Sequence, residues 1–155
     1  SPRASSPDTI EDTVMTVVRA NFLPEFDFAD DAVLLTLDRF GVAAILGALR
    51  TSIETGSSKT IIDGVVHDFA IIAHRAHMQL RRDQVTWQLD SAKAGELASG
   101  LTVLHDSGSA RGGHIYVDIR HPAPTLVLSR DEYLHMNYPW IEPPADTTPP
   151  QTSAP

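Results

Sequence analysis

Two segments of this chain, residues 33–57 and 85–109, repeat one hydrophobic pattern at a constant offset of 52 residues. Few residues are identical, but apolar, polar and turn-forming positions agree along both segments, and Asp38 aligns with Asp90. Agreement of this kind requires both segments to form the same local structure. A strand followed by a helix, present twice, is therefore the strongest restriction that the sequence places on the fold.

Each copy opens with a period-two pattern typical of a strand with one buried face. The residues expected to point inward are Val33, Leu35 and Leu37 in the first copy and Val85, Trp87 and Leu89 in the second. A helical stripe follows, with apolar positions three and four residues apart. Its members are Val42, Ile45, Leu46, Leu49 and Ile53 in the first copy and Ala94, Leu97, Ala98, Leu101 and His105 in the second. Each predicted helix thus packs one face on a sheet.

The ends of the two helices carry capping residues. Asp38 and Asp90 stand where a side-chain oxygen accepts from the unpaired amides of the first helical turn. Gly56 and Gly108 follow the two helices, where a left-handed backbone conformation commonly ends a helix. We therefore interpret both aspartates as caps before considering them as catalysts.

Further strands are predicted around both copies, over residues 15–23, 65–73, 76–80, 114–120 and 125–128. A short helix before residue 15 is a further expectation. The result is an α+β fold: mostly antiparallel sheet with two main helices on one face, built from two pseudo-repeated strand-helix-strand-strand units.

The chain ends differ in composition from the rest. Residues 1–7 and 143–155 are rich in Pro, Ser and Thr and poor in large apolar residues, so burial does not offset the entropy lost on ordering. We expect two disordered tails flanking a single domain over residues 8–142.

The segment after residue 128 combines a helix start with aromatic residues. Ser129 and Glu132 have the spacing of a capping box, which predicts a short helix over residues 133–136. Beyond it, Tyr138 and Trp140 stand in an extended arm. Such rings usually cover an exposed core edge or a second subunit, so a homodimer is one expectation.

The charge balance restricts the partners. Twelve Lys and Arg against twenty Asp and Glu give a net charge of −8, which repels phosphate backbones and anionic lipid. We expect no nucleic acid and no membrane partner, and instead another protein, one that is basic. The chain has no cysteine and opens without a signal-peptide pattern, so we expect a cytoplasmic protein.

An acidic segment lies between the first predicted strand and the first copy of the repeat. It contributes the first set of candidate partner-binding residues: Glu25, Asp27, Asp30 and Asp31. Two interpretations are open. The segment is either a solvated loop whose neighbouring Phe26 and Phe28 return to the core, or an acidic contact for a partner.

The predicted strand over residues 114–120 carries the best candidate for chemistry. Its polar side chains recur at period two on one face: His114, Tyr116, Asp118 and Arg120. His114 and Asp118 are the candidate catalytic pair, acting as acid and base. The alternative is a partner-facing sheet surface, which antiparallel sheets commonly present. With Tyr138 and Trp140, these four residues complete the candidate partner-binding set.

Other motifs predict no cofactor and no metal. His74 and His77 face opposite sides of a strand, and a metal site needs three or more converging ligands. The Gly-rich stretch over residues 108–113 leads out of a helix into a strand, whereas a phosphate-binding loop leads into a helix N-terminus. We interpret that stretch as a connection.

Three short motifs carry a family resemblance: Val85–Asp90, Gly113–Asp118 and Ser129–Tyr133. They resemble small bacterial α+β proteins of the toxin-immunity type, over roughly the second half of the chain. In those proteins a tryptophan-bearing strand, a helix and a Gly-His hairpin end in a Ser-x-Asp-Glu-Tyr turn. The resemblance implies an inhibitor that covers a basic toxin through residues 25–31 or the His114 face.

The leading hypothesis is therefore a non-enzymatic protein-binding module, either an immunity-type inhibitor or an assembly protein. Two alternatives stay open. One is a small enzyme that uses His114 and Asp118, and the other is a small-molecule binder in the groove between the repeats.

Overall fold

The computed structural model describes residues 16–26, 30–73, 76–107, 113–119, 122–132, 134, 136 and 138–143. The eight strands over these residues are β1 (Val18–Leu23), β2 (Ala32–Leu37), β3 (Ser57–Ile62), β4 (Val65–Ile71), β5 (His77–Leu80), β6 (Gln84–Leu89), β7 (Gly113–Asp118) and β8 (Thr125–Arg130). The two helices are α2 (Arg39–Thr55) and α3 (Ser91–Ser107). The predicted tail over residues 1–7, the helix before residue 15 and all of the second tail except Pro143 lie outside the described residues.

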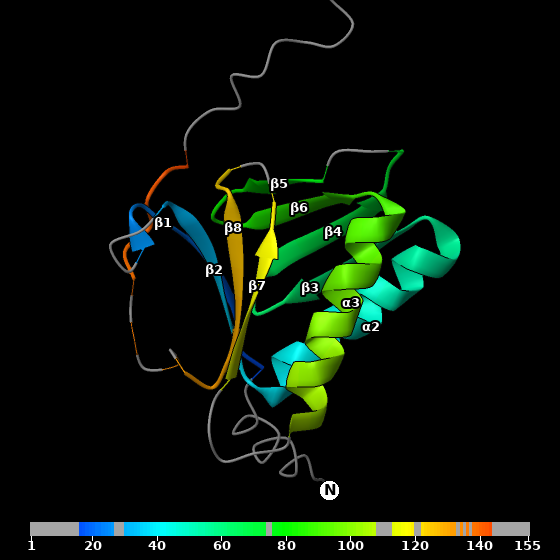
Figure 1. The fold of residues 1–155 in the computed structure, drawn as a ribbon, viewed down its shortest axis with the longest axis horizontal. Coiled ribbons are helices and arrows are strands. Elements are labelled where there is room, and N and C mark those ends of the chain that lie inside the picture. The colour runs from blue at the N-terminus through cyan, green and yellow to red at the C-terminus, as the bar shows by residue number, and fades with distance from the viewer. Residues whose placement is uncertain are drawn as a thin grey trace, which may run out of the picture.

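The strands form two four-stranded sheets, as Figure 1 shows. The first sheet has the order β1-β2-β8-β7 and the second has the order β3-β4-β6-β5. In each sheet the outer pairs are antiparallel and the central pair is parallel. The α+β fold with mostly antiparallel pairing is thus confirmed, but the strands divide between two sheets where one was expected.

The division follows from the helical connections. The chain leaves β2 in the first sheet, passes through α2 and enters β3 in the second sheet. It returns in the opposite direction from β6 through α3 to β7. Each parallel pair therefore joins strands from different halves of the chain, a long-range contact that local periodicity does not encode.

The segments proposed as repeats have strand and helix bounds 52 residues apart, since β2 and α2 cover 32–37 and 39–55 while β6 and α3 cover 84–89 and 91–107. Strand β3 was not predicted. Four of its six residues are Ser, Lys or Thr, and it lies at a sheet edge against β4 alone. An edge strand has no need of a continuous apolar face, which explains the missing signal.

The predicted helix caps are confirmed where the structure describes them. The Asp38 carboxylate accepts a hydrogen bond from the Gly41 amide at 2.7 Å, and the Asp90 carboxylate accepts from the Lys93 amide at 2.7 Å. Gly56 closes α2 with a φ of 100°, in the left-handed region. Gly108 lies outside the described residues.

Helices α2 and α3 lie side by side against both sheets (Figure 1). The core between helices and sheets includes Trp87 and Phe69, whose rings stack 5.1 Å apart. Most of the predicted helical stripe is buried, but Ile53 is 46% exposed and His105 is exposed. Placing those two positions on the buried stripe was wrong, because the buried position in the last turn of each helix is one residue earlier, at Ser52 in α2 and Leu104 in α3. In the described part of the chain, neither helix is long and apolar enough to cross a membrane.

The short helix predicted after Ser129 is also wrong over its described residues. Ser129 belongs to β8 and donates through its hydroxyl to the Glu132 carboxylate at 3.2 Å. Asp131 then has a φ of 67°, a left-handed conformation that a first helical turn does not contain. The spacing of Ser129 and Glu132 therefore marks a turn after a strand.

Candidate functional site

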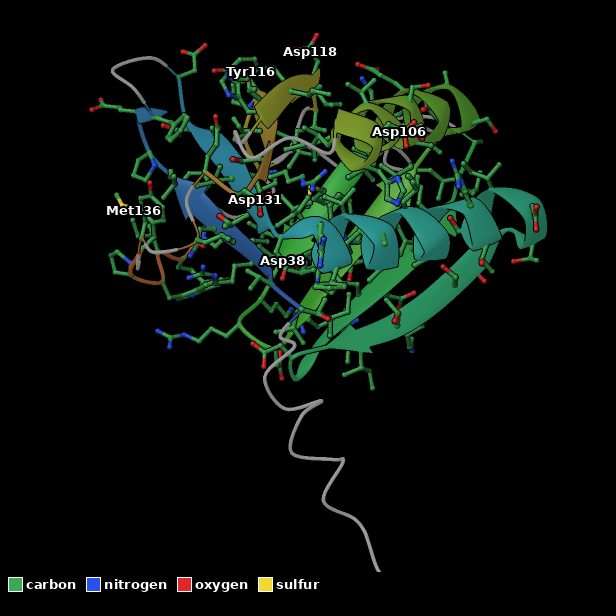
Figure 2. The ribbon with its side chains drawn as sticks, turned by 90° about the horizontal axis from the view of Figure 1, so that it is seen from below. Asp38, Asp106, Tyr116, Asp118, Asp131 and Met136 are labelled. Carbon is green, nitrogen blue, oxygen red and sulfur yellow. The ribbon has the colours of Figure 1, made fainter. Side chains whose placement is uncertain are left out.

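Strand β7 presents three of the predicted site residues on one exposed face. His114, Tyr116 and Asp118 are exposed and alternate with Ile115 and Val117, which lie inward. Figure 2 shows Tyr116 and Asp118 projecting outward from the sheet. Tyr116 is 58% exposed, a high value for a large aromatic side chain. Arg120, the fourth residue predicted on this face, lies outside the described residues.

The imidazole of His114 makes its contacts with residues other than Asp118. Its Nδ1 lies 3.0 Å from the Glu132 carboxylate, and its ring meets the Tyr116 ring edge to face at 5.3 Å. Residues four apart on a strand are separated by about 13 Å. His114 and Asp118 are therefore too far apart to hydrogen-bond to one another.

The acidic segment between β1 and β2 has both structural and exposed carboxylates. Asp31 accepts a hydrogen bond from the Glu25 amide at 3.0 Å, and Glu25 has a φ of 51°. Asp31 thus stabilises the turn, whereas Glu25 and Asp30 are exposed. Phe26 packs on a small apolar cluster of the first sheet, as expected for a ring that returns to the core. Asp27 and Phe28 lie outside the described residues.

Sheet pairing brings the acidic segment next to the β7 face. Ala32 at the start of β2 lies opposite Thr125 of β8, and Thr125 lies opposite Asp118 of β7. These neighbours form a depression of about 290 Å³, which we call the outer hollow. Its lining residues are Phe26, Asp30, Ala32, Tyr116, Asp118, Thr125 and Val127. Two candidate surfaces that are about 90 residues apart in the sequence are thus one surface.

The aromatic arm packs on its own chain. Trp140 packs against the main core, and Tyr138 packs against the small cluster that also holds Phe26. Arg19 of β1 fixes the start of the arm by donating to the Leu134 and Met136 carbonyls at 2.6 and 3.2 Å. Of the two interpretations given for these rings, the structure therefore shows them covering a core edge.

A second cavity, of about 350 Å³, lies between β1 of the first sheet and the β3–β4 and β5–β6 turns of the second. We call it the arginine cavity. Its polar and aromatic lining residues include Arg19, Asp63, His67, Arg81, Arg82 and Trp140. Of these residues, only Trp140 was singled out from the sequence, as part of the aromatic arm. The sequence did contain a signal for His67, because it lies on the same strand face as Val65, Phe69 and Ile71, a face that is otherwise apolar.

His67 is fully buried and electrically neutral. The indole of Trp87 donates to its Nδ1 at 3.2 Å, and an indole N–H only donates. The proton of the neutral imidazole therefore lies on Nε2, a buried atom without a hydrogen-bond partner among the described residues. Burial lowers the pKa of His67 from its ordinary value of 6.5 to about 4.

This lowered pKa predicts an acid-sensitive fold. Between pH 6.5 and 4 the unfolded chain binds a proton that folded His67 does not, so stability falls as the pH decreases through that window. The loss is at most about 3 kcal/mol. Unfolding by urea at pH 7.5, 5.5 and 4 measures it, with His67→Asn as the reference, since the amide oxygen keeps an acceptor for Trp87. Parallel stability profiles for the two proteins would contradict neutral burial.

Comparison with known proteins gives no family assignment: no protein-family model, curated protein or solved structure matches this chain. Within the described residues, no group of three His, Asp or Glu side chains converges in a way that could hold a metal ion. His74 and Arg75 are outside that part of the chain. The functional argument therefore depends on the outer hollow and the arginine cavity.

Proposed function

We propose that this chain is a non-enzymatic protein-binding module that receives a basic side chain of its partner in the outer hollow. The observation that carries this proposal is the combination of two aromatic rings, Phe26 and Tyr116, with two exposed carboxylates, Asp30 and Asp118, around one depression. A lysine or arginine side chain matches this lining. Its stem contacts the rings while its charge meets the carboxylates.

The energetics favour recognition of this kind. A cation over an aromatic face contributes about 0.5–1 kcal/mol at an exposed site and more when water is excluded. The net charge of −8 increases the encounter rate with a basic protein, and this effect weakens as salt is added. An inhibitor of a basic toxin and an assembly protein with a basic partner both use a surface of this chemistry.

The surroundings of His114 support a preorganised binding face. Its Nδ1 already contacts Glu132, and its ring packs against Tyr116. Both contacts hold the edge of the β7 face in one conformation. A preorganised aromatic surface loses less entropy on association than a mobile one.

Site-specific photo-crosslinking in lysate of the native host tests the proposal. A photoreactive phenylalanine analogue at position 116 is expected to give a discrete crosslinked product containing a basic protein. The same analogue at Ile61, which is 67% exposed on β3 of the other sheet, serves as the control and is expected to give none. Equal products from both positions would contradict the proposal.

Charge variants add a quantitative arm to the experiment. Asp30→Asn combined with Asp118→Asn is expected to weaken binding of the captured partner by about tenfold or more, the equivalent of 1.4 kcal/mol. The matched control combines Asp83→Asn with Asp106→Asn, which removes the same charge from exposed positions elsewhere. Equal weakening by both pairs would reduce the effect to net charge and overturn the role of the hollow.

A further inference from the structure

The arginine cavity has a positive lining in an acidic protein. Three guanidinium groups, those of Arg19, Arg81 and Arg82, line it together with a single described carboxylate, that of Asp63. The chain as a whole carries a net charge of −8. A local excess of positive charge inside a recess concentrates anions there, because the low-dielectric walls focus the field.

The guanidinium groups are partly preorganised. Arg19 donates two hydrogen bonds to the carbonyls of Leu134 and Met136, and a guanidinium has five N–H donors in all. Arg82 lies over the Trp140 ring at 5.7 Å. These contacts hold two of the three cations at the cavity without neutralising them.

Apart from Asn21 and His67, the remaining walls are apolar or aromatic. Val18, Ala20, Val65 and Val85 line the cavity with Tyr138 and Trp140. The volume of about 350 Å³ lies in the range of small-molecule sites, about 300–1,000 Å³. An inorganic anion would leave these walls without contacts, whereas an organic acid would cover them.

His67 adds an independent observation that points to an acceptor. It lines the same cavity, it is 1% exposed, and its Nε2 has no partner among the described residues. An unpaired buried donor costs about 1–3 kcal/mol. A ligand oxygen that reached this N–H would remove that cost.

We propose that the arginine cavity binds a small organic carboxylate with an apolar body. The carboxylate lies between the guanidinium groups of Arg81 and Arg82, with one oxygen directed at the Nε2–H of His67, and the apolar body lies along the valines and the Trp140 ring. The site is distinct from the outer hollow and does not depend on the proposed partner.

Titration followed by proton–nitrogen NMR tests the proposal on the whole chain. The probe is 3-phenylpropionate, and 3-phenylpropanol is the neutral analogue of the same shape. The chain has two tryptophans: Trp140 lines the cavity and Trp87 hydrogen-bonds to His67. We expect the carboxylate to shift both indole signals and to bind about tenfold or more tightly than the alcohol. Equal affinity for acid and alcohol, or indole signals that do not move, would overturn the proposal.

Two variant pairs locate the charge recognition. Arg81→Gln with Arg82→Gln is expected to abolish the preference for acid over alcohol. The control, Arg39→Gln with Arg50→Gln, removes two exposed arginines outside the cavity and is expected to retain it. If both variant pairs lost the preference for acid over alcohol, the preference would follow from the overall charge of the protein, and the proposed role of Arg81 and Arg82 would be wrong.

Two further probes distinguish a small organic acid from two other anionic ligands, inorganic phosphate and a peptide C-terminus. Inorganic phosphate that bound as tightly as 3-phenylpropionate would overturn the role of the apolar walls. N-acetyl-alanyl-phenylalanine presents a carboxylate at the end of a peptide. If it bound more tightly than 3-phenylpropionate, the cavity would be a peptide-terminus site and the assignment to a small free acid would fail.

Discussion

Replacement of Arg130 by methionine is expected to destabilise the fold by about 3–5 kcal/mol, the largest effect predicted for a single residue of this protein. Arg130 is a buried cation, only 7% exposed, at the end of β8. Methionine fills much of the same volume but has neither the charge nor the donors. The loss is therefore electrostatic more than steric.

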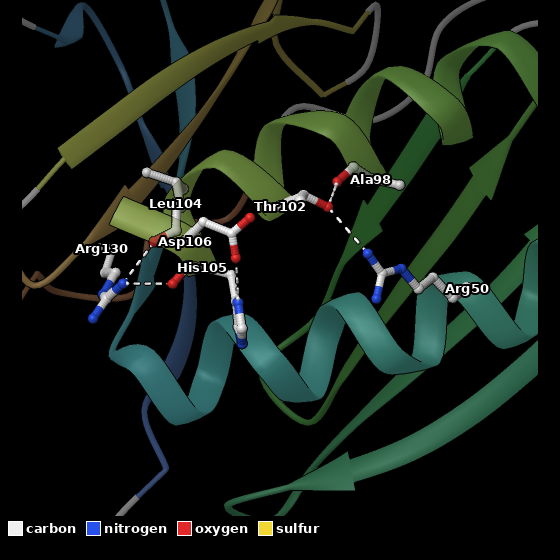
Figure 3. A network of polar contacts seen from close by, with 7 residues as sticks. All are labelled: Arg50, Ala98, Thr102, Leu104, His105, Asp106 and Arg130. Atoms are coloured by element: carbon white, nitrogen blue, oxygen red, sulfur yellow. Dashed lines mark hydrogen bonds and ion pairs between the residues drawn. The ribbon is translucent and has the colours of Figure 1, made fainter. Parts of the chain in front are cut away.

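The contacts of Arg130 explain the size of this effect. Its guanidinium donates to the Leu104 and His105 carbonyls at 2.6 and 3.2 Å, near the end of α3, as Figure 3 shows. Carbonyls of the last helical turn have no partner within the helix, and the negative end of the helix dipole favours a cation. Asp131 binds the same guanidinium at 3.1 Å. Arg130 thus attaches α3 to the first sheet.

Equilibrium unfolding in urea, monitored by circular dichroism, measures the effect. Arg130→Lys keeps the charge without the planar fork of donors and is expected to lose an intermediate amount. Arg50 provides the control in the same network (Figure 3), because its contact with Thr102 at 3.3 Å is exposed. Arg50→Met is expected to change stability by less than about 0.5 kcal/mol. Equal losses for Arg130→Met and Arg50→Met would contradict the capping role.

Substitution of Gly41 by alanine is expected to destabilise the protein by about 3 kcal/mol or more. A Cβ at this position would lie 2.0 Å from the carbonyl oxygen of Val17, a backbone atom that cannot rotate away. The same oxygen accepts from the Asp38 amide at 3.3 Å, and the Val17 amide donates to the Asp38 carboxylate at 3.0 Å. Displacing Val17 therefore disturbs the cap of α2 as well.

A second glycine in α2 provides the matched control. A Cβ at Gly47 would have no neighbour within 4 Å, so Gly47→Ala is expected to stabilise the helix by about 0.5–1 kcal/mol. Thermal and urea unfolding of both variants give opposite signs under this prediction. Destabilisation by both would mean that α2 does not tolerate alanine for a reason other than the approach of Val17.

The position aligned with Gly41 in the other helix shows that glycine is not required by the helix itself. Lys93 stands there, 52 residues later, and it too donates its amide to the capping aspartate. The close approach of Val17 to α2 explains the difference. The contact between Val17 and Gly41 cannot be inferred from the sequences of the two segments alone.

Sequence patterns predicted correctly those elements that depend on residue spacing within a short segment. The alternation of Val33, Leu35 and Leu37 predicted β2, and the capping carboxylates of Asp38 and Asp90 predicted the starts of both helices. Sequence patterns failed where a segment had little local preference and its structure was set by pairing with other strands. The polar strand β3 forms because β4 pairs with it, and Ser129 lies in a strand because β2 and β7 pair with β8 on either side.

The candidate sites divide in the same way. Period-two alternation was enough to place His114, Tyr116 and Asp118 on one face. It did not show that Asp30 lies beside them, because that neighbourhood depends on the parallel pairing of β2 with β8. The arginine cavity also depends on tertiary structure, since Arg19, His67 and Arg82 come from three separate strands and turns.

The sequence by itself determined the α+β class, the two helices with their caps and the inward faces of most strands. These features follow from residue spacing and from hydrogen bonds within a few residues, which are set along the chain. Only the tertiary structure decided the division into two sheets, the outer hollow and the arginine cavity. Each of these arises from contacts between distant segments, where burial and pairing override what any one segment favours.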